Sequence, residues 1–433
     1  MIVGAGFAGL EAARRLRRVP VQTVLVDQHN HHVFTPFLYQ VATALLEPAE
    51  VAEPVRGLLR RIPNADFRLG RATGVDLAAR RVHIAGHDDL PYDYLILAAG
   101  SVNNYFGNES IAQRSLGLND LPEALALRNR ILEQLERAAW ERDPVRRRRL
   151  LTFAVVGGGP TGVELAGALA VLTREVASRD FRALEPGAAR IVLVEASSAP
   201  LPPFAPRLQR AAARALARKG VQVVSGQARE VTDAGVRLKD GRTIEAGTVV
   251  WAAGVRASDL AGGLELPRGS HGRVKVDATL RPAGRREVFV VGDLAEIPGS
   301  GEPLPMLAQV GIQSGRHAAD SIAALIAGGE PSSFHYRDLG TMATIGRNDA
   351  VAQIGPLKLS GFVGWLAWLL VHIARIVGLR TRLLVLANWI SGYLLLDRPV
   401  RLILRPSDQP AAEPAREGAE GATHEPASTG AAR

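Results

Sequence analysis

The chain contains the same glycine pattern twice, each time directly after a run of apolar residues. The first copy, Met1 to Gly9, is MIVGAGFAG, and the second, Phe153 to Gly162, is FAVVGGGPTG. In a strand–turn–helix unit the first glycine makes the tight turn, the second lets the backbone approach a pyrophosphate, and the third lets the helix pack on the strand. The repeat therefore predicts an α/β chain with two dinucleotide-binding units.

The first copy begins a complete strand–turn–helix–strand unit. A helical stretch from Leu10 to Arg18 precedes a valine-rich strand, Val21 to Val26, which ends on Asp27. An acid at this point can accept hydrogen bonds from ribose hydroxyls, while the helix N-terminus faces the phosphates. Only three residues precede the first glycine, against about five or six in an ordinary strand, so we expect the native chain to start upstream of Met1. The cofactor contacts predicted here are Gly4, Gly6, Phe7, Ala8, Gly9 and Asp27.

The second copy has a longer crossover. Its second strand, Arg190 to Val194, ends on Glu195, 38 residues after Gly157, which predicts a helical insertion near 173–188. A carboxylate at the ribose repels a 2′-phosphate, so Glu195 favours NADH over NADPH. The contacts predicted in this unit are Gly157, Gly159, Pro160, Thr161, Gly162 and Glu195.

Two apolar strands end in Ala-Ala-Gly, a sequence that lets the chain pass close to a ligand at the end of a sheet. The residues concerned are Ala99 and Gly100 in the first unit and Ala253 and Gly254 in the second. Thr35-Pro36 predicts a rigid turn suited to holding a flat ring system.

Glu164 stands two residues after the last glycine of the second copy, in the first turn of the helix. It either only interacts favourably with the helix dipole or lies beside the nicotinamide and the flavin, where its charge matters. His29, His31 and His32 form a cluster, but no carboxylate or cysteine joins them at ligand spacing. We expect a loop of solvated or hydrogen-bonded histidines and no metal site.

Composition limits the chemistry open to the chain. The 433 residues include no cysteine, which excludes disulfides, thiolate metal sites, iron–sulfur clusters and cysteine nucleophiles. The formal charge of +9 comes almost wholly from arginine spread along the chain, so it does not by itself indicate nucleic acid. No charged and apolar leader with a cleavage site opens the sequence, which favours a cytoplasmic location.

One dinucleotide unit inside another resembles the two-dinucleotide-binding flavoproteins over residues 1–330. The resemblance implies FAD in the first unit and NADH in the inserted one. It also implies that Gly292 and Asp293, which follow an apolar strand, meet the ribitol of FAD. We expect an FAD domain of residues 1–115 and 255–330, and an NADH domain of residues 116–254. The absent cysteines exclude the disulfide reductases and sulfide:quinone oxidoreductases of this superfamily.

The stretch Ala308 to Gly315, AQVGIQSG, is the predicted exit for electrons. Gln309 and Gln313 are four residues apart and share a helix face, and we expect Gly311 and Gly315 to leave room beside them. The stretch resembles the AQxxxQ signature of type II NADH:quinone oxidoreductases. That resemblance implies that the two amides hydrogen-bond the quinone carbonyls and that Ala308 approaches the isoalloxazine. The family often has other residues at Gly311 and at the position after Gln313, so the likeness does not extend to the whole pocket lining.

The composition changes after about residue 330. His335 to Ile354 predicts strands, and two apolar runs follow, Leu359 to Ala374 and Leu383 to Leu396. The first run has 16 residues, short of the about 20 that span a bilayer. A spanning hairpin, buried core helices and interfacial helices are the three alternatives, and the tryptophans with flanking arginines favour the interface. We expect a membrane-anchoring domain over residues 331–406 and a disordered tail over 407–433.

Taken together, these features predict two nested Rossmann-like domains, for FAD and NAD, with a C-terminal membrane-interface helical region. The predicted protein is a peripheral, non-proton-pumping NADH:quinone oxidoreductase on the cytoplasmic face of the membrane. Its expected partners are a membrane quinone, menaquinone or ubiquinone, and an anionic lipid surface, with pairing of two copies and no nucleic acid. A reductase of a soluble acceptor such as ferredoxin, and a non-catalytic NADH sensor docked on a membrane, are the alternatives.

Overall fold

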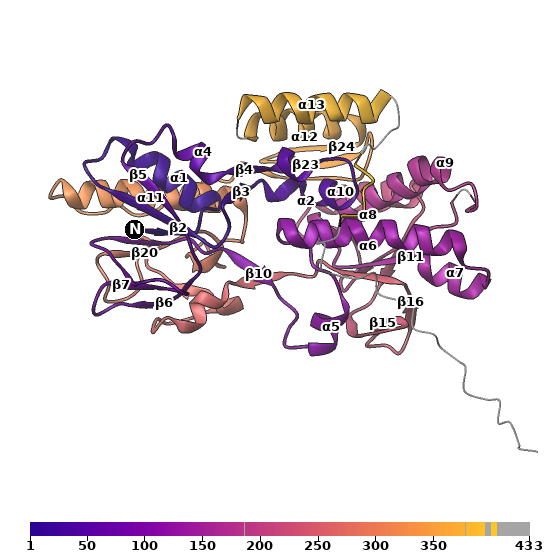
Figure 1. Ribbon diagram of the computed structural model, residues 1–433, viewed down its shortest axis with the longest axis horizontal. Coiled ribbons are helices and arrows are strands. Elements are labelled where there is room, and N and C mark those ends of the chain that lie inside the picture. The colour runs from indigo at the N-terminus through magenta and orange to yellow at the C-terminus, as the bar shows by residue number, and fades with distance from the viewer. Residues whose placement is uncertain (186, 377, 395–399, 405–433) are drawn as a thin grey trace, which may run out of the picture.

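The computed structural model describes residues 1–185, 187–376, 378–394 and 400–404, so the tail predicted to be disordered lies outside the described residues. Figure 1 shows two sheet-centred units side by side, linked through β10 (Ser101–Asn103), with two C-terminal helices lying across the top.

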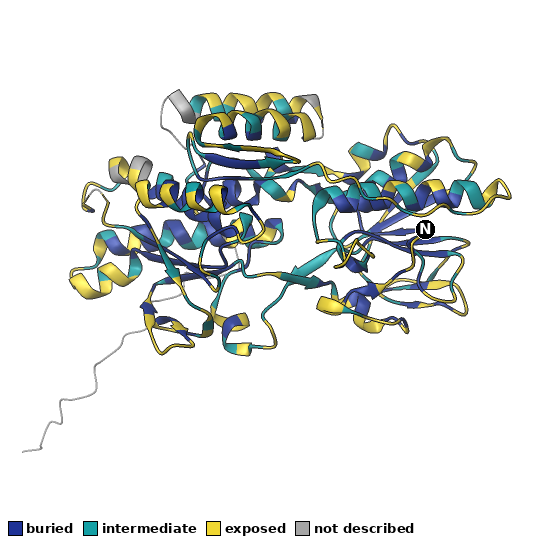
Figure 2. Cartoon of the chain, turned by 180° about the vertical axis from the view of Figure 1, so that it is seen from behind, coloured by how far each residue is buried: buried dark blue, intermediate teal, exposed yellow. Residues whose placement is uncertain are grey.

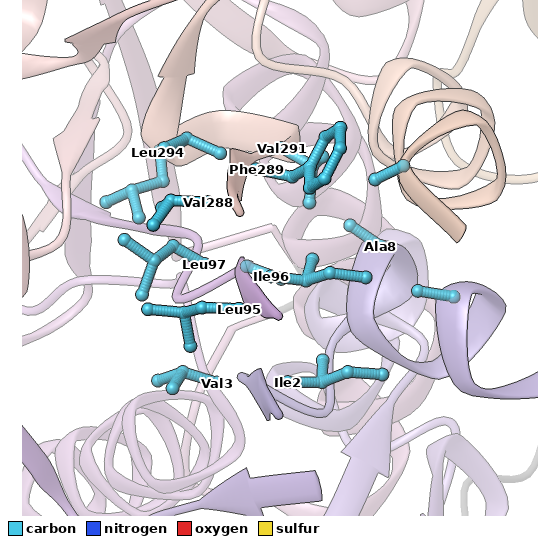
Figure 3. Close-up of a cluster of buried hydrophobic side chains, with 14 of the residues drawn as sticks. Ile2, Val3, Ala8, Leu95, Ile96, Leu97, Val288, Phe289, Val291 and Leu294 are labelled. Carbon is cyan, nitrogen blue, oxygen red and sulfur yellow. The ribbon is translucent and has the colours of Figure 1, made fainter. Parts of the chain in front are cut away.

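The first unit is built on a parallel sheet with the order β20-β9-β1-β2-β5. Its strands are β1 (Ile2–Val3), β2 (Thr23–Asp27), β5 (Ala65–Leu69), β9 (Leu95–Leu97) and β20 (Val288–Val290). Short continuous apolar runs are typical of parallel strands that are covered on both faces. Figure 3 shows the buried side chains of β1, β9 and β20 in one cluster with Ala8 of α1 (Phe7–Arg15). A long helix, α11 (Ala308–Ile326), packs against α1.

The second unit repeats this plan with a parallel sheet of order β13-β12-β11-β17. Its elements are β11 (Thr152–Val156), α8 (Pro160–Val171), β12 (Arg190–Glu195), α10 (Pro206–Arg218), β13 (Val221–Ser225) and β17 (Thr248–Trp251), with α6 (Leu121–Trp140) and α7 (Pro144–Leu150) before them. The insertion predicted near 173–188 is helical only to Asp180, through a π-helical turn, Leu172–Ala177, and α9 (Ser178–Asp180).

Two antiparallel strands carry the chain between the units. β10 leaves the first unit and pairs with β18 (Val255–Ala257), which returns to it, so that Ser101 lies opposite Ala257. Beyond β10, α5 (Glu109–Arg114) already packs on β14 (Ala228–Thr232) of the second unit. The nested α/β arrangement predicted from the sequence is confirmed, while the residue limits of the domains remain a prediction.

Smaller elements complete the two units. They are β3 (His31–Val33), α2 (Leu38–Ala42), α3 (Pro48–Val51), β4 (Ala52–Pro54), α4 (Val55–Leu59), β6 (Ala72–Asp76), β7 (Arg81–Ile84), β8 (Leu90–Pro91), β15 (Gly235–Leu238), β16 (Thr243–Glu245), β19 (Val274–Lys275) and β21 (Ala295–Glu296). Of these, α2 packs on α6 and α8, and therefore joins the first unit to the second.

The C-terminal region forms an antiparallel sheet, β22 (Thr341–Thr344), β23 (Ala350–Ile354) and β24 (Leu357–Ser360), followed by α12 (Gly361–Arg375) and α13 (Leu379–Leu394). The prediction of strands from His335 is wrong for residues 335–340, because side chains of α11 rather than a neighbouring strand hold that backbone. None of the helices that the structure describes has both the length and the apolarity needed to cross a bilayer. The outer faces of α12 and α13 are largely exposed, as Figure 2 shows.

Candidate functional site

The first glycine turn requires glycine at two positions and leaves space at a third. Gly4 has φ +107°, and a Cβ there would lie 2.2 Å from the Ala98 carbonyl oxygen. A Cβ on Gly9 would lie 1.8 Å from the Gly4 carbonyl oxygen, so glycine alone lets α1 pack this close. Nothing meets a Cβ on Gly6 within 4 Å. The N–H groups at the start of α1, which begins with Phe7 and Ala8, therefore lie beside open space. Phosphate binding at a helix N-terminus requires this arrangement.

Side chains of the same unit brace this turn. Asp27 accepts the Ala5 N–H at Oδ2 and the His29 N–H at Oδ1, both across 2.7 Å. The buried His32 ring donates from Nδ1 to the Ala5 carbonyl oxygen, 2.9 Å away. Burial lowers the pKa of His32 to about 4, so the ring is neutral at physiological pH. His32 is hydrogen-bonded as predicted, but the prediction of a loop is wrong here, because His31 and His32 lie in β3.

The second glycine turn repeats this geometry. Gly157 has φ +111°, and a Cβ there would lie 2.4 Å from the Ala252 carbonyl oxygen. A Cβ on Gly162 would lie 1.8 Å from the Gly157 carbonyl oxygen, whereas nothing meets one on Gly159 within 4 Å. Pro160 and Thr161 form the first turn of α8 beside that space. The two turns therefore present matching anion-binding geometry.

Glu195 plays the same part for the second turn that Asp27 plays for the first. Its Oε2 accepts the Gly158 N–H across 2.6 Å, and its Oε1 accepts the Ser197 N–H across 2.7 Å. The carboxylate is buried directly beneath the turn. It therefore fixes a negative charge next to the open space over the start of α8.

The two Ala-Ala-Gly sequences lie where the sheets meet β10 and β18, the crossing strands that connect the two units. Gly100, after Ala99, has φ +67°, and Gly254, after Ala253, has φ +130°. Their carbonyl oxygens accept N–H groups from the opposite crossing segments, at 3.1 Å and 3.0 Å respectively. The carboxyl ends of both sheets are thus tied together at one place.

Asp293 lies in a turn after β20 that begins at Gly292, whose φ is +64°. Its Oδ2 accepts a hydrogen bond from Ser101 Oγ across 2.7 Å. Burial raises the pKa of Asp293, while the Ser101 hydrogen bond and the Arg273 charge oppose that rise. Gly292 N–H donates to Ser314 Oγ, 3.0 Å away in the first turns of α11. The Gly-Asp turn and the first turns of α11, the helix that begins at Ala308, are therefore neighbours.

Gln309 and Gln313 do share a face of α11, and both amides hold the segment 337–340. Gln309 Oε1 accepts the Leu339 N–H and its Nε2 donates to the Gly340 carbonyl oxygen, at 3.0 Å and 3.1 Å. Gln313 makes the same pair of bonds to Arg337 N–H and carbonyl oxygen, at 3.0 Å and 2.9 Å. Each amide therefore makes the two hydrogen bonds with this backbone that a neighbouring strand would otherwise make.

The expectation that the glycines of α11 leave room for a ligand is wrong at Gly315. A Cβ on Gly315 would lie 2.1 Å from the Ala8 carbonyl oxygen, because α1 fills that space. A Cβ on Gly311 would make only ordinary contacts at 3.8 Å with Phe7 and Ala8. These glycines permit close helix packing, which places α11 next to the first glycine turn.

Glu164 is buried between α8, β22 and α12. Its Oε1 accepts the Thr344 N–H across 3.3 Å. Burial raises the pKa of Glu164 to about 8, against a smaller opposing effect of Thr344 and the Trp368 indole. Burial therefore favours the protonated form of this side chain.

Thr35 and Pro36 lie in a short 3-10 helix, Thr35–Phe37, that leads into an aromatic cluster. The Phe37 ring is 5.4–5.8 Å from the rings of Trp368, His372 and Trp389. Burial lowers the pKa of His372 to about 4, so this ring is also neutral. Sequence reasoning missed the cluster, although the tryptophans of the apolar runs were the available signal.

Hydrogen bonds from its inner face fix α13 to the first unit. Asn388 donates to Glu50, Thr381 donates to Glu53, and Trp389 Nε1 donates to Gln40 Oε1 across 2.8 Å. The helix is therefore held by polar groups on one side, and its other side faces outward.

Two family models and several known proteins match most of the chain. Residues 1–315 match the family model described as pyridine nucleotide-disulphide oxidoreductase, and residues 339–396 match the NDH2 C-terminal domain. The chain is 42% identical over 414 residues to type II NADH:quinone oxidoreductase Ndh of Mycobacterium tuberculosis, covering 92% of this chain and 88% of that protein. It is 30% identical over 431 residues to an internal alternative NAD(P)H-ubiquinone oxidoreductase of Arabidopsis thaliana, covering 91% and 84%. The solved structure of NDH2 from Plasmodium falciparum in complex with NADH has the same fold, with a TM-score of 0.84 at 18% identity, covering 93% of this chain and 99% of that one.

Proposed function

This chain belongs to the pyridine nucleotide-disulphide oxidoreductase family, and we propose that its two glycine turns bind FAD and NADH in the order expected from the sequence. The protein is an NADH:quinone oxidoreductase of type II with FAD as cofactor. FAD, when bound, accepts a hydride from NADH and passes two electrons to the quinone. The chain itself binds, orients and shields these molecules.

The first turn fits FAD. The open space over Gly6 admits a pyrophosphate, the N–H groups of α1 face it, and one oxygen of Asp293 is left for a hydroxyl. The residues proposed to hold FAD are Gly4, Gly6, Phe7, Ala8, Gly9, Asp27, Thr35, Pro36, Ala99, Gly100, Gly292, Asp293 and Ala308. Asp27 keeps lone pairs beyond its two backbone bonds, and these can accept ribose hydroxyls.

The second turn fits NADH for the same geometric reasons. Glu195 places a buried negative charge at the ribose position, which disfavours the 2′-phosphate of NADPH. The residues proposed to hold NADH are Gly157, Gly159, Pro160, Thr161, Gly162, Glu195, Ala253 and Gly254. Glu164, later in the same helix α8, contacts Thr344 of β22 and Trp368 of α12.

We propose that Glu164 holds a proton at the junction of the NADH unit and the C-terminal region. Reduction of a quinone to a quinol consumes two protons. A carboxyl group with a pKa of about 8 is protonated at neutral pH and can release that proton with little cost. Its burial between α8 and α12 keeps bulk water from competing for the group.

On the acceptor side, Gln309 and Gln313 keep a free donor each. A primary amide nitrogen carries two N–H groups, and among the described residues each Nε2 donates only to the segment 337–340. We propose that the second N–H of each amide donates to a quinone carbonyl. The contact between Ser314 and Gly292 supports this assignment, because it sets the start of α11 beside the flavin turn.

The outward faces of α12 and α13 are proposed to lie on a lipid surface. Their exposed apolar residues are Phe362, Val363, Leu366, Leu370, Val371, Leu383, Leu384, Leu386 and Ile390. Exposed Arg375 and Arg380 flank this set, a combination that binds anionic lipid. A quinone dissolved in the lipid would then reach α11 from that side. The alternative is that a second copy of the chain covers the outward faces of α12 and α13.

Anaerobic mixing of the purified protein with NADH tests the reaction order. The flavin absorbance should bleach within the mixing experiment, and later addition of a soluble quinone should restore it. Flavin that stays oxidised with NADH, or reduced flavin that a quinone cannot reoxidise, would contradict the proposal.

A further inference from the structure

A hydroxyl group of the crossing strand β10 donates a hydrogen bond to the carboxylate of the Gly-Asp turn. Ser101 is the first residue of β10, and its Oγ donates to Asp293 Oδ2 across 2.7 Å, although the two residues are 192 positions apart. Among the described residues, Ser101 is the side chain that hydrogen-bonds this carboxylate. The bond occupies one oxygen and leaves Oδ1 for a ligand.

The hydrogen bond from Ser101 affects the pKa of the Asp293 carboxylate as well as its orientation. Burial raises the pKa of Asp293, and the Ser101 hydrogen bond and the Arg273 guanidinium act against that rise. Arg273 is shared with a second acid, Glu296, 4.0 Å away. Ser101 is thus the group that stabilises the ionised form of Asp293 by direct contact.

Ser101 is itself tied to the second unit. Its carbonyl oxygen accepts Asn119 Nδ2 across 2.9 Å. The Asn119 N–H and the Asn103 amide donate to the two oxygens of Glu123, each across 2.6 Å. Glu123 lies in the first turn of α6. A continuous polar chain therefore links the Gly-Asp turn, the crossing strand and the NADH unit.

We propose that Ser101 is a positioning residue that orients Asp293 toward FAD through the hydrogen bond from its Oγ to Oδ2, and that Asn119 holds Ser101 in place from the NADH unit. This inference rests on the proposed role of Asp293 in binding FAD. It extends that role because it makes FAD retention depend on a residue of the crossing strand and on the docking of the second unit.

Release of FAD from the holoenzyme on dilution, followed by flavin fluorescence, measures the effect. Ser101→Ala should weaken FAD binding about tenfold, because a hydrogen bond to a carboxylate is lost. Ser101→Thr keeps a hydroxyl and should bind FAD nearly as the wild type does. Ser115→Ala is the matched control, because Ser115 Oγ donates to the Ile111 carbonyl oxygen at the end of α5, away from Asp293.

The pH dependence of FAD release separates positioning from general damage to the fold. In the wild type, FAD binding should weaken at acid pH as Asp293 takes up a proton. Without the Ser101 hydrogen bond the pKa of Asp293 is higher, so in Ser101→Ala the weakening should begin at a higher pH. Asn119→Ala should have a smaller effect, and adding it to Ser101→Ala should bring no further loss, because both changes act on one contact.

Asp293→Asn separates the role of Ser101 from the role of Asp293 itself in binding FAD. If Asp293→Asn loses FAD while Ser101→Ala retains it as the wild type does, the positioning role is overturned and the FAD assignment stands. If Asp293→Asn itself retains FAD with wild-type affinity, the proposed FAD contact is wrong and the inference falls with it. An unshifted pH profile in Ser101→Ala also overturns the inference.

Discussion

Glu164 shows at the scale of one residue how burial changes chemistry. It lies near the start of α8, where a carboxylate normally favours the helix dipole, yet its pKa is raised to about 8 by burial. An unfolded glutamate has its ordinary pKa of 4.5, so folding takes up a proton between pH 4.5 and about 8. Stability is therefore lost as the pH rises through this window, and Glu164 costs most above it.

Glu164→Gln should remove that dependence, because glutamine keeps the shape and stays neutral. Its stability advantage over the wild type should grow by up to about 1.4 kcal/mol per pH unit between pH 5 and pH 8. Unfolding measured across this range checks the slope, with Glu245→Gln on the exposed strand β16 as control. Parallel stability curves for Glu164→Gln and the wild type would show that the group is not neutral when folded.

Single residues divide clearly into those that the sequence could predict and those it could not. The turn and packing roles of Gly4 and Gly9 depend on neighbours within one strand–turn–helix unit, and they were predictable. The raised pKa of Glu164 comes from burial beneath β22 and α12, which are far along the chain, so local sequence could not show it.

At the scale of elements, the C-terminal helices were predictable as helices but not in how they are held. Two apolar runs with tryptophans and flanking arginines indicated two helices, whereas the polar contacts under α13 come from α2, α3 and β4. The segment 337–340 was expected to be a strand, and amides of α11 hold it instead. When side-chain amides take the hydrogen bonds that a neighbouring strand would otherwise make, the sequence shows no pattern that would predict it.

Asn388→Leu tests how α13 is held. The change leaves the Glu50 carboxyl, whose pKa burial already raises, without its Asn388 donor. The cost of an unsatisfied buried polar group is about 1–3 kcal/mol, so α13 should open more often. Hydrogen exchange should become faster along residues 379–391. Leu386→Ala, on the exposed side of the same helix, should leave exchange nearly unchanged, and equal protection in both variants would refute the inner-face contact.

For the whole molecule, the nested fold was predicted mainly from the order of the motifs along the chain. Two glycine turns, a Gly-Asp turn and paired glutamines appear in the sequence in the order that a nested fold requires, and that fold is confirmed. What the sequence could not show is how the units touch. The contact of α2 with α6 and the polar chain from Asp293 to α6 arise only when both units are folded together.

The lipid assignment is a whole-molecule prediction because it needs α12 and α13 to face the same way. Leu370 is 64% exposed on α12, so Leu370→Ser should weaken binding to vesicles containing anionic lipid without unfolding the protein. Val145 on α7 is 68% exposed, and Val145→Ser is the matched control. Co-sedimentation with vesicles gives the readout. Equal binding of both variants, or loss of a dimer rather than of vesicle binding, would contradict the lipid assignment.

We propose that NADH delivers electrons at one place in the enzyme and that the quinone removes them at another, beside α11. Sequential stopped-flow mixing, first with NADH and then with a soluble quinone, measures the two steps separately. Gln309→Leu should bleach at the wild-type rate and be reoxidised about tenfold more slowly, because the amide is lost. Gln222→Leu removes an amide oxygen that accepts hydrogen bonds from Arg190 of β12, and it should match the wild type in both steps. Bleaching slowed as much as reoxidation, or reoxidation at the wild-type rate, would show that Gln309 does not bind the quinone at a separate place.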